Sequence, residues 1–418
     1  MIFNIAFASL RNRLSTVLLT VISIAVSVMI VLAVEHIRHE VKNSFTQTLS
    51  GTDLIVGARS GRINLLLYSV FRIGNATNNV SWKSYQTVAQ QKNIRWTIPL
   101  SLGDSHKGYR VLGTNLDYFT YYRYGQKNAL TFAQGQAFSS VYDVVLGAEV
   151  AKQLDYTLDQ KIILSHGISD VSFNQHDDKP FTIVGILTPT GTPVDQTVHV
   201  SLAGIEAIHV DWKNGAPLMG LTIDAESALS KNLTPKTITA FLVGLDNKIR
   251  TFQLQRQINQ FRGEPLLAIL PGIALSELWQ SMKIIEKVLA LVAALVVASS
   301  LLGMITMILS TLKQRQREIA ILRATGASAR FIFALVQIET ALIAIIGTAL
   351  GITLLWVSLL IAQPIISEHY GIVLPSNIIT AHTALYALGI IVLSILLAII
   401  PALLAYRQSL AHGLSVRE

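Results

Sequence analysis

The sequence predicts a helical membrane protein in which a mixed α+β domain is inserted between the first and second of four transmembrane helices. Composition is the first observation: of 418 residues, 51% are hydrophobic and only 14% are charged, whereas soluble domains carry about 25% charged residues. The second observation is that four apolar runs reach the roughly 20 residues that a spanning helix requires. These runs are residues 14–34, 288–312, 331–362 and 384–405.

The first apolar run predicts a retained membrane anchor. Residues 14–34 contain no charge and follow Arg11 and Arg13. The apolar region of a cleaved signal peptide has roughly 7–15 residues and precedes a small-residue cleavage site. This run is longer, and no clear A-x-A site follows it.

The distribution of Lys and Arg predicts the orientation of the spans, because short cytoplasmic loops are enriched in these residues. The segment 313–330 carries five of them against one acid, whereas the loop 363–383 carries none. We therefore expect both termini to be cytoplasmic and residues 35–287 to lie outside. The net charge of +8 is then largely a topology signal, and we expect no nucleic-acid partner.

These patterns predict a multi-pass protein of the cell membrane, which is the inner membrane if the source is a Gram-negative bacterium. The chain is thereby divided into eight predicted segments. They are the N-terminal tail with the first span (1–34), the outer domain with its helical stalks (35–287), the second span (288–312), a cytoplasmic segment (313–330), the third span (331–362), an outer loop (363–383), the fourth span (384–405) and the cytoplasmic tail (406–418).

The predicted outer region is long enough for a folded domain with its own core. Its two ends, residues 35–50 and 274–288, have apolar residues at helical spacing and predict helices continuous with the adjoining spans, together forming a stalk. Between these ends, residues 141–165 are typical of a strand, a helix, a turn and a second strand, with strand cores at 144–146 and 162–164. Residues 180–202 predict two strands separated by a turn rich in Gly, Pro and Thr.

Motifs for catalysis are missing from the sequence. There is no cysteine, no G-x-x-x-x-G-K-[ST] phosphate loop, no H-E-x-x-H and no G-x-S-x-G. We expect no catalytic residues and no cofactor held by this chain. If the protein moves anything, the energy is expected to come from another chain.

A short charged segment between spans two and three is the main candidate site. It reads RQREIAILRATGAS, residues 315–328. Residues 317–325 predict a helix with Glu318 in the first turn and Arg323 in the last, as the helix dipole favours. Gly326 supplies a left-handed residue that ends the helix, and Ser328 can cap the next one.

This predicted helix is amphipathic, and two interpretations fit it. Ile319 and Leu322 lie three residues apart on one face, while Arg315 and Arg323 are spaced for a different face. The helix is either a surface helix among lipid head groups or a lever that docks into a partner protein. The residue pattern by itself favours neither.

The motif REIAILRATGAS resembles the coupling helix of the FtsX/MacB-like permeases, a family of ABC transporter membrane subunits of the mechanotransmission type. The resemblance extends over nearly the whole chain. Residues 144–165 and 181–202 resemble the family's periplasmic core domain, 335–352 resemble the stretch after the coupling helix, and 401–418 resemble its C-terminal ending. Members of the macrolide-exporter type carry a fused ATPase domain, which this sequence lacks.

The resemblance implies partners and a mechanism. It implies a homodimer, or a close heterodimer, with two separate ABC ATPase subunits that bind the ATP. Motion driven by ATP would pass through the spans to the outer domain, where substrate is pushed, extracted or released, with membrane lipids and possible periplasmic adaptors as further partners. The residues that match the ATPase contact segment are Arg317, Glu318, Ile319, Leu322, Arg323 and Gly326.

Three functions from different classes fit this scheme. The leading one is a permease that exports or extracts a hydrophobic or lipid-linked substrate. The second is a transmembrane regulator that activates an extracytoplasmic hydrolase by the same motion. The third is a lipoprotein-releasing permease. An enzyme in its own right is not expected.

Three polar or small residues in span three are further candidates. Glu339 lies eight residues past the start of the span. An acid at this depth either has a function or is a structural carboxylate paired with a cytoplasmic arginine, and we favour the structural role. Gly347 and Gly351 are four residues apart and permit close helix packing, either within the chain or at a dimer seam.

Histidines and acids of the outer region are the candidates for metal binding. They are His166, His176, Asp177, Asp178, His199 and His209. Their spacing matches no standard zinc signature, so we favour scattered surface residues and expect no metal site. In the same region, RINLLLYSVF (residues 62–71) is either a buried element, which we favour, or an exposed apolar patch for a lipid or a partner.

Overall fold

The computed structural model describes residues 2–167, 178–213, 216–217, 223–370, 378 and 380–411. The chain divides into two compact units. The helical unit consists of residues 1–40, 283–365 and 374–418, and the sheet unit consists of residues 41–282 and 366–373. Each unit is described by itself below.

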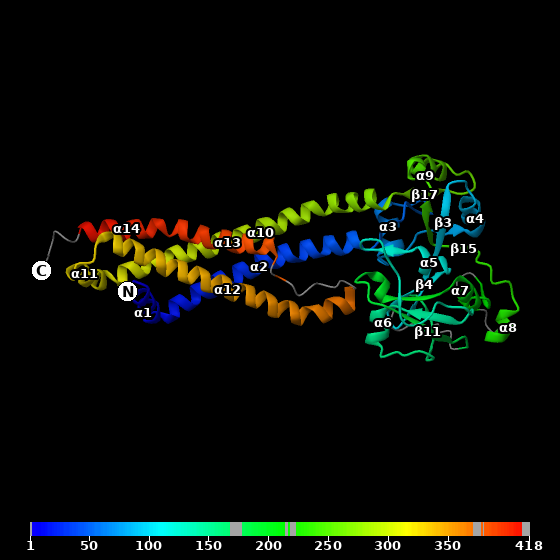
Figure 1. The fold of residues 1–418 in the computed structure, drawn as a ribbon, viewed down its shortest axis with the longest axis horizontal. Coiled ribbons are helices and arrows are strands. Elements are labelled where there is room, and N and C mark those ends of the chain that lie inside the picture. The colour runs from blue at the N-terminus through cyan, green and yellow to red at the C-terminus, as the bar shows by residue number, and fades with distance from the viewer. Residues whose placement is uncertain are drawn as a thin grey trace. The chain divides into compact units, whose positions relative to one another are not determined.

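The described residues contain four helical stretches that are long and apolar enough to cross a membrane, as the sequence predicts (Figure 1). They are α2 (Leu14–Gln47), α10 (Pro271–Gln314), α12 (Ala329–Tyr370), and α13 (Ala381–Leu397) with α14 (Ile399–Ala411). Two shorter helices belong to the same unit, α1 (Ile2–Arg11) and α11 (Gln316–Ala324). The predicted helical continuations of the first two spans are confirmed, since α2 and α10 each run on as one helix.

Two helix boundaries differ from the prediction. Helix α12 continues to Tyr370, beyond the predicted end at residue 362, because that end was placed where hydropathy falls and a helix does not need apolar residues to continue. The last span is two helices rather than one, since α13 ends at Leu397. Pro401 has no N–H for the carbonyl of Leu397, and its ring clashes with that carbonyl, which accounts for the break.

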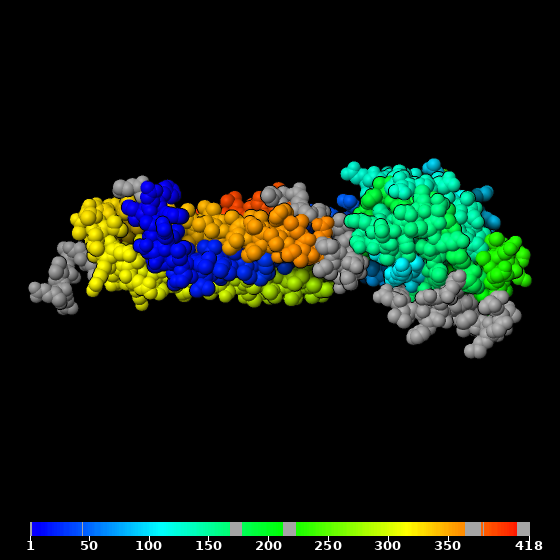
Figure 2. Space-filling model, turned by 90° about the horizontal axis from the view of Figure 1, so that it is seen from below, coloured from blue at the N-terminus to red at the C-terminus, as the bar shows by residue number. Residues whose placement is uncertain are grey.

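Helix α12 packs closely against α2 through two glycines. A Cβ atom at Gly347 would lie 2.8 Å from Cγ2 of Ile24, and one at Gly351 would lie 2.6 Å from the carbonyl oxygen of Ala25. Figure 2 shows α2 in blue running against α12 in orange. These glycines therefore serve packing within one chain, which was one of the two predicted alternatives.

The sheet unit is built on one mixed sheet of 11 strands among the described residues. Its main order is β17 (Leu266–Ile269), β1 (Leu54–Ala58), β16 (Ala240–Leu245), β3 (Ile94–His106), β4 (Tyr109–Thr114), β12 (Thr197–Ser201), β8 (Asp143–Leu146), β11 (Phe181–Leu187) and β7 (Phe132–Gly135). The short strands β9 (Lys161–Ile162) and β10 (Ser165–His166) pair with β11 and β3. The pairs β4–β12 and β8–β11 are parallel, and the other pairs of this sheet are antiparallel.

Shorter elements complete the sheet unit. The helices are α3 (Arg62–Val70), α4 (Trp82–Ala89), α5 (Asp117–Tyr121), α6 (Ala148–Gln153), α7 (Leu202–Ile208), α8 (Ala225–Leu229) and α9 (Thr251–Asn259), with 3-10 turns at Pro193–Gln196 and Lys248–Arg250. Three two-stranded ribbons are β13 (Trp212–Lys213) with β14 (Ala216–Pro217), β15 (Thr237–Ile238) with β2 (Val80–Ser81), and β5 (Arg123–Tyr124) with β6 (Asn128–Ala129).

Alternating side chains of the sheet supply a hydrophobic core on each face. Along β1, Ile55 joins the core that contains α3 and α5, whereas Leu54 and Val56 join the core that contains α4 and α9. Farther along the sheet, α6 and α7 pack with β8 and β12 in a third cluster. The sheet is thus the middle layer of the unit, because strands bury successive residues on opposite faces.

The local predictions for this unit hold, apart from the end of one strand. The strand, helix and strand predicted over residues 141–165 are present as β8, α6 and β9, but β9 ends at Ile162 and Leu164 lies outside it. The two strands predicted over residues 180–202 are present as β11 and β12, which are separated in the sheet by β8. The apolar segment 62–71 forms the buried helix α3, with Leu65 and Tyr68 at most 1% exposed, and this confirms the buried alternative.

Replacing Gly351 by alanine tests the packing of α12 on α2. The added Cβ meets a backbone oxygen, which cannot rotate away, so we expect overpacking to lower the free energy of unfolding by about 1–3 kcal/mol. Thermal unfolding in detergent measures the effect. Gly389→Ala in α13 is the matched control, since a Cβ there meets no described atom within 4 Å. Equal stability of the two variants would contradict the close packing.

Candidate functional site

The candidate site begins with α11, a nine-residue helix that connects α10 to α12. Its end is a Schellman motif, in which the N–H of Ala327 donates to the carbonyl of Leu322 (2.9 Å) and that of Gly326 to the carbonyl of Arg323 (3.0 Å). Gly326 has a φ of 98°, a conformation that glycine adopts without strain. Ser328 Oγ then accepts from the N–H of Phe331 (3.3 Å) and caps α12. The predicted stop at Gly326 and cap at Ser328 are confirmed.

The side chains of α11 differ in their exposure. Ile319 and Leu322, the predicted apolar face, are half-buried within the helical unit. Ile321, which the sequence analysis did not single out, is 64% exposed. The sequence could have indicated this exposure, because Ile321 lies about 100° around the helix from Leu322 and therefore on a different face.

The charged residues of α11 are also distributed unevenly. Arg317 and Glu318 are exposed, whereas Arg323 is half-buried and donates from its guanidinium to the carbonyl of Ala327 (3.3 Å). The face that α11 presents to the surroundings therefore combines an arginine, a glutamate and an isoleucine.

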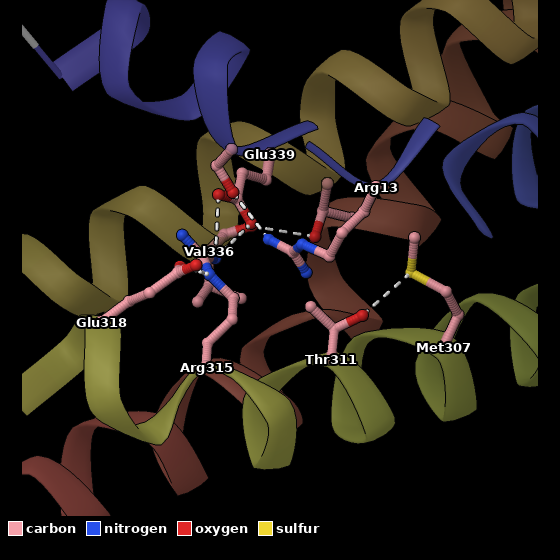
Figure 3. A network of polar contacts seen from close by, with 9 residues as sticks. Arg13, Met307, Thr311, Arg315, Glu318, Val336 and Glu339 are labelled. Carbon is pink, nitrogen blue, oxygen red and sulfur yellow. Dashed lines mark hydrogen bonds and ion pairs between the residues drawn. The ribbon is translucent and has the colours of Figure 1, made fainter. Parts of the chain in front are cut away.

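A buried ion pair joins the start of α11 to α12 (Figure 3). Arg315, which directly follows α10, donates from one guanidinium nitrogen to both carboxylate oxygens of Glu339, at 3.0 Å each. A second guanidinium nitrogen donates to the carboxylate of Glu318 (2.9 Å). The Arg315 and Glu339 side chains are only 5% and 10% exposed. Glu339 thus has the arginine partner that the sequence analysis favoured, while its role in function stays a prediction.

The N-terminal segment adds a second guanidinium beside this pair. Arg13 lies between α1 and α2 and donates to the hydroxyl of Ser9 (2.6 Å). Arg13, Arg315 and Glu339 line one small cavity together with apolar side chains of α10 and α12. The polar cluster is therefore shared by the first three spans, and Glu339 is placed ten residues into α12, roughly 15 Å along its axis.

The predicted metal candidates do not form one cluster. His199 is fully buried in the core, where desolvation lowers its pKa to about 3 and keeps the imidazole neutral. Asp178 pairs with the buried Lys179 (2.6 Å), and His176 and Asp177 lie outside the described residues. His166 and His209 do come together. They meet at Asp104, a residue that the sequence analysis did not consider.

The fold and this site define a class, a multi-pass membrane protein with an α/β domain inserted after its first span. Two family models match the chain. Residues 14–261 match the MacB-like periplasmic core domain, and residues 290–410 match the FtsX-like permease C-terminal domain. The chain belongs to the MacB/FtsX-like family of ABC transporter permeases. The comparison with curated proteins finds no match to this sequence.

The solved structures that resemble part of the chain include the domains of two other proteins. The periplasmic region of MacB from Actinobacillus actinomycetemcomitans is 11% identical, with a TM-score of 0.33 over 56% of this chain and 94% of that one. The extracellular domain of the noncanonic ABC-type transporter YknZ from Gram-positive bacteria is 10% identical, with a TM-score of 0.30 over 52% of this chain and 99% of that one. The family assignment rests on the family models.

Replacing Glu339 by glutamine tests the buried ion pair. The variant leaves the Arg315 guanidinium buried with only the exposed Glu318 as a charged partner, so we expect a loss of roughly 3 kcal/mol of folding free energy. Thermal unfolding of the detergent-solubilised protein is the measurement. Glu318→Gln is the matched control and is expected to cost less than about 1 kcal/mol, because Glu318 is solvent-exposed. If both variants unfold at the same temperature, the pair does not stabilise the helical unit.

Proposed function

We propose that this chain is the permease subunit of an ABC transporter in which α11 docks to a separate ATPase subunit and transmits its motion. The observation that carries the proposal is the attachment of α11. The helix is joined to α10 by the single residue Arg315, and the guanidinium of Arg315 is hydrogen-bonded to the carboxylate of Glu339 in α12. A force on α11 therefore reaches two candidate spans without crossing a flexible loop.

The exposed surface of α11 supports docking to a protein. Arginine is enriched among interface anchors, and an exposed apolar side chain gains free energy when a partner covers it. Arg317 and Ile321 provide these two features on one short helix. In the family scheme, the contact segment comprises Arg317, Glu318, Ile319, Leu322, Arg323 and Gly326. The half-buried Ile319 and Leu322 would then fix α11 to its own unit, while Arg317 and Ile321 would meet the partner.

Helix α10 supports transmission toward the sheet unit. It is one uninterrupted helix of 44 residues, and it begins two residues after β17 ends. In the proposed cycle, two ATPase subunits bind and hydrolyse ATP below a dimer of permeases. Their movement passes through α11 and α10 to the sheet unit, which lies outside the membrane and exports or extracts a hydrophobic or lipid-linked substrate there.

Copurification tests the docking step. The tagged protein is isolated from native membranes in mild detergent, and an ABC ATPase is identified and quantified by mass spectrometry. We expect Ile321→Asp and Arg317→Glu each to reduce the recovered ATPase by about tenfold or more, since loss of an interface anchor costs more than about 1.4 kcal/mol.

The matched control is Ile249→Asp, which changes an isoleucine that is 89% exposed in the sheet unit. This variant should retain the ATPase at the level of the unmodified protein. Recovery of the ATPase with both α11 variants would show that α11 is not the docking site. Absence of any ATPase from the unmodified protein would contradict the proposed function itself.

A further inference from the structure

Asp104, His166 and His209 converge in the sheet unit, away from the site described above. The Asp104 carboxylate lies 3.0 Å from Nδ1 of His166 and 3.6 Å from Nε2 of His209. The two imidazole nitrogens are 3.4 Å apart. Each residue thus directs one potential ligand atom at a common point, and these atoms lie within 4.8 Å of one another.

These separations match those of a tetrahedral metal site. Zinc binds imidazole nitrogen and carboxylate oxygen at about 2.0–2.2 Å. Tetrahedral angles then place neighbouring ligand atoms about 3.3–3.5 Å apart. The observed separations of 3.0, 3.4 and 3.6 Å bracket this value, so an ion can enter with small side-chain movements.

The fold positions the three side chains by three different elements. His166 lies on β10, which pairs with β3 so that His166 is opposite Asp104. The pairing of β3 with β4 shifts register between Leu102 and Ser105, and such a bulge re-aims the side chains it contains. His209 directly follows α7 and is its C-cap residue. The residues are therefore brought together by the pairing of β10 with β3 and by the end of α7, and not by any local sequence motif.

The hydrogen bond of His209 prepares its ring for a metal. Nδ1 of His209 lies 2.8 Å from the carbonyl oxygen of Ile205, and a carbonyl only accepts, so Nδ1 carries the hydrogen. In the neutral ring the lone pair is then on Nε2, which is the atom that faces Asp104 and His166. Metal-binding histidines in proteins typically donate their other ring N–H to a carbonyl or carboxylate in this way.

Asp104 needs a positive counterpart. Its side chain is 4% exposed, and a buried carboxylate is costly unless a cation compensates it. In the part of the chain that the structure describes, its ion-pair partners are the two histidines. A divalent ion coordinated by all three groups supplies that charge.

We propose that Asp104, His166 and His209 form a binding site for a divalent transition-metal ion, with Zn²⁺ as the ion that best matches the donor set. Two imidazoles and one carboxylate with tetrahedral spacing are typical of zinc. The imidazoles remain 42% and 23% exposed, so the ion reaches the site from solvent and keeps a position for water. Bound zinc ties β10 and α7 to the central strand β3. The site is independent of the proposed docking of α11.

Zinc binding by the full-length protein tests this site. The protein carries a tag without histidines, is stripped of metal with a chelator, and is titrated with Zn²⁺ alone by calorimetry in lipid nanodiscs. We expect one Zn²⁺ per chain and a rise in the unfolding temperature when it binds. Co²⁺ in the same site should give the visible absorption of tetrahedral coordination.

Single substitutions locate the site. Asp104→Asn, His166→Ala and His209→Ala should each weaken Zn²⁺ binding by more than about 100-fold, since even loss of an outer-shell partner weakens such sites by roughly 10–100-fold. His166 is an exposed residue, so its variant is expected to fold, and circular dichroism checks this for all three. The matched control is His39→Ala, which removes a histidine of the helical unit.

The proposal is overturned by either of two results. One is a metal-free protein that takes up no more Zn²⁺ than the variant with all three residues replaced. The other is stoichiometric binding at a different place in the protein. This would be shown if binding survives in the folded His166→Ala and His209→Ala proteins, or if it is lost in His39→Ala.

Discussion

The buried ion pair of Arg315 and Glu339 is the interaction on which the arrangement around α11 depends. A guanidinium and a carboxylate removed from water must remain together, because either one alone would be a buried, uncompensated charge. Arg315 occupies the one-residue junction between α10 and α11, and Glu339 lies ten residues into α12. The pair thus fixes the start of α11 against α12. Desolvation of the two charged groups offsets much of their attraction, so the net stabilisation from the pair is small. We interpret its main role as fixing the position of α11.

Close packing complements this polar contact in the helical unit. Lipid tails are as apolar as leucine, so helices within a membrane associate through close van der Waals contact and polar contacts rather than the hydrophobic effect. Gly347 and Gly351 let α12 approach the backbone of α2, while Glu339 holds the arginine that follows α10. Helix α12 therefore contacts α2 through close packing at its glycines and the end of α10 through an ion pair.

In the sheet unit, polar groups are placed in the interior by the pairing of strands. Its central strand β3 pairs with β4, the next strand in the sequence, and with β16 and β10, which come from later parts of the chain. Asp104 is buried at the place where β4 and β10 flank β3. Two histidines from separate elements lie beside this carboxylate, and the same arrangement provides the converging ligand atoms of the proposed zinc site.

Local signals in the sequence determined the four apolar helices, the α/β character of the inserted domain and the short helix ended by Gly326, because hydropathy, alternation and capping act over a few residues. The sequence also indicated an arginine partner for Glu339, since an acid surrounded by apolar residues is costly to bury without a positive partner. Only the tertiary structure decided that this partner is Arg315, that Ile321 is the exposed isoleucine of α11, and that the two glycines of α12 pack within the chain. It also decided that His166 and His209 meet at Asp104. Those outcomes depend on contacts between residues 24 to more than 300 positions apart, and no local pattern encodes which distant surfaces pack together.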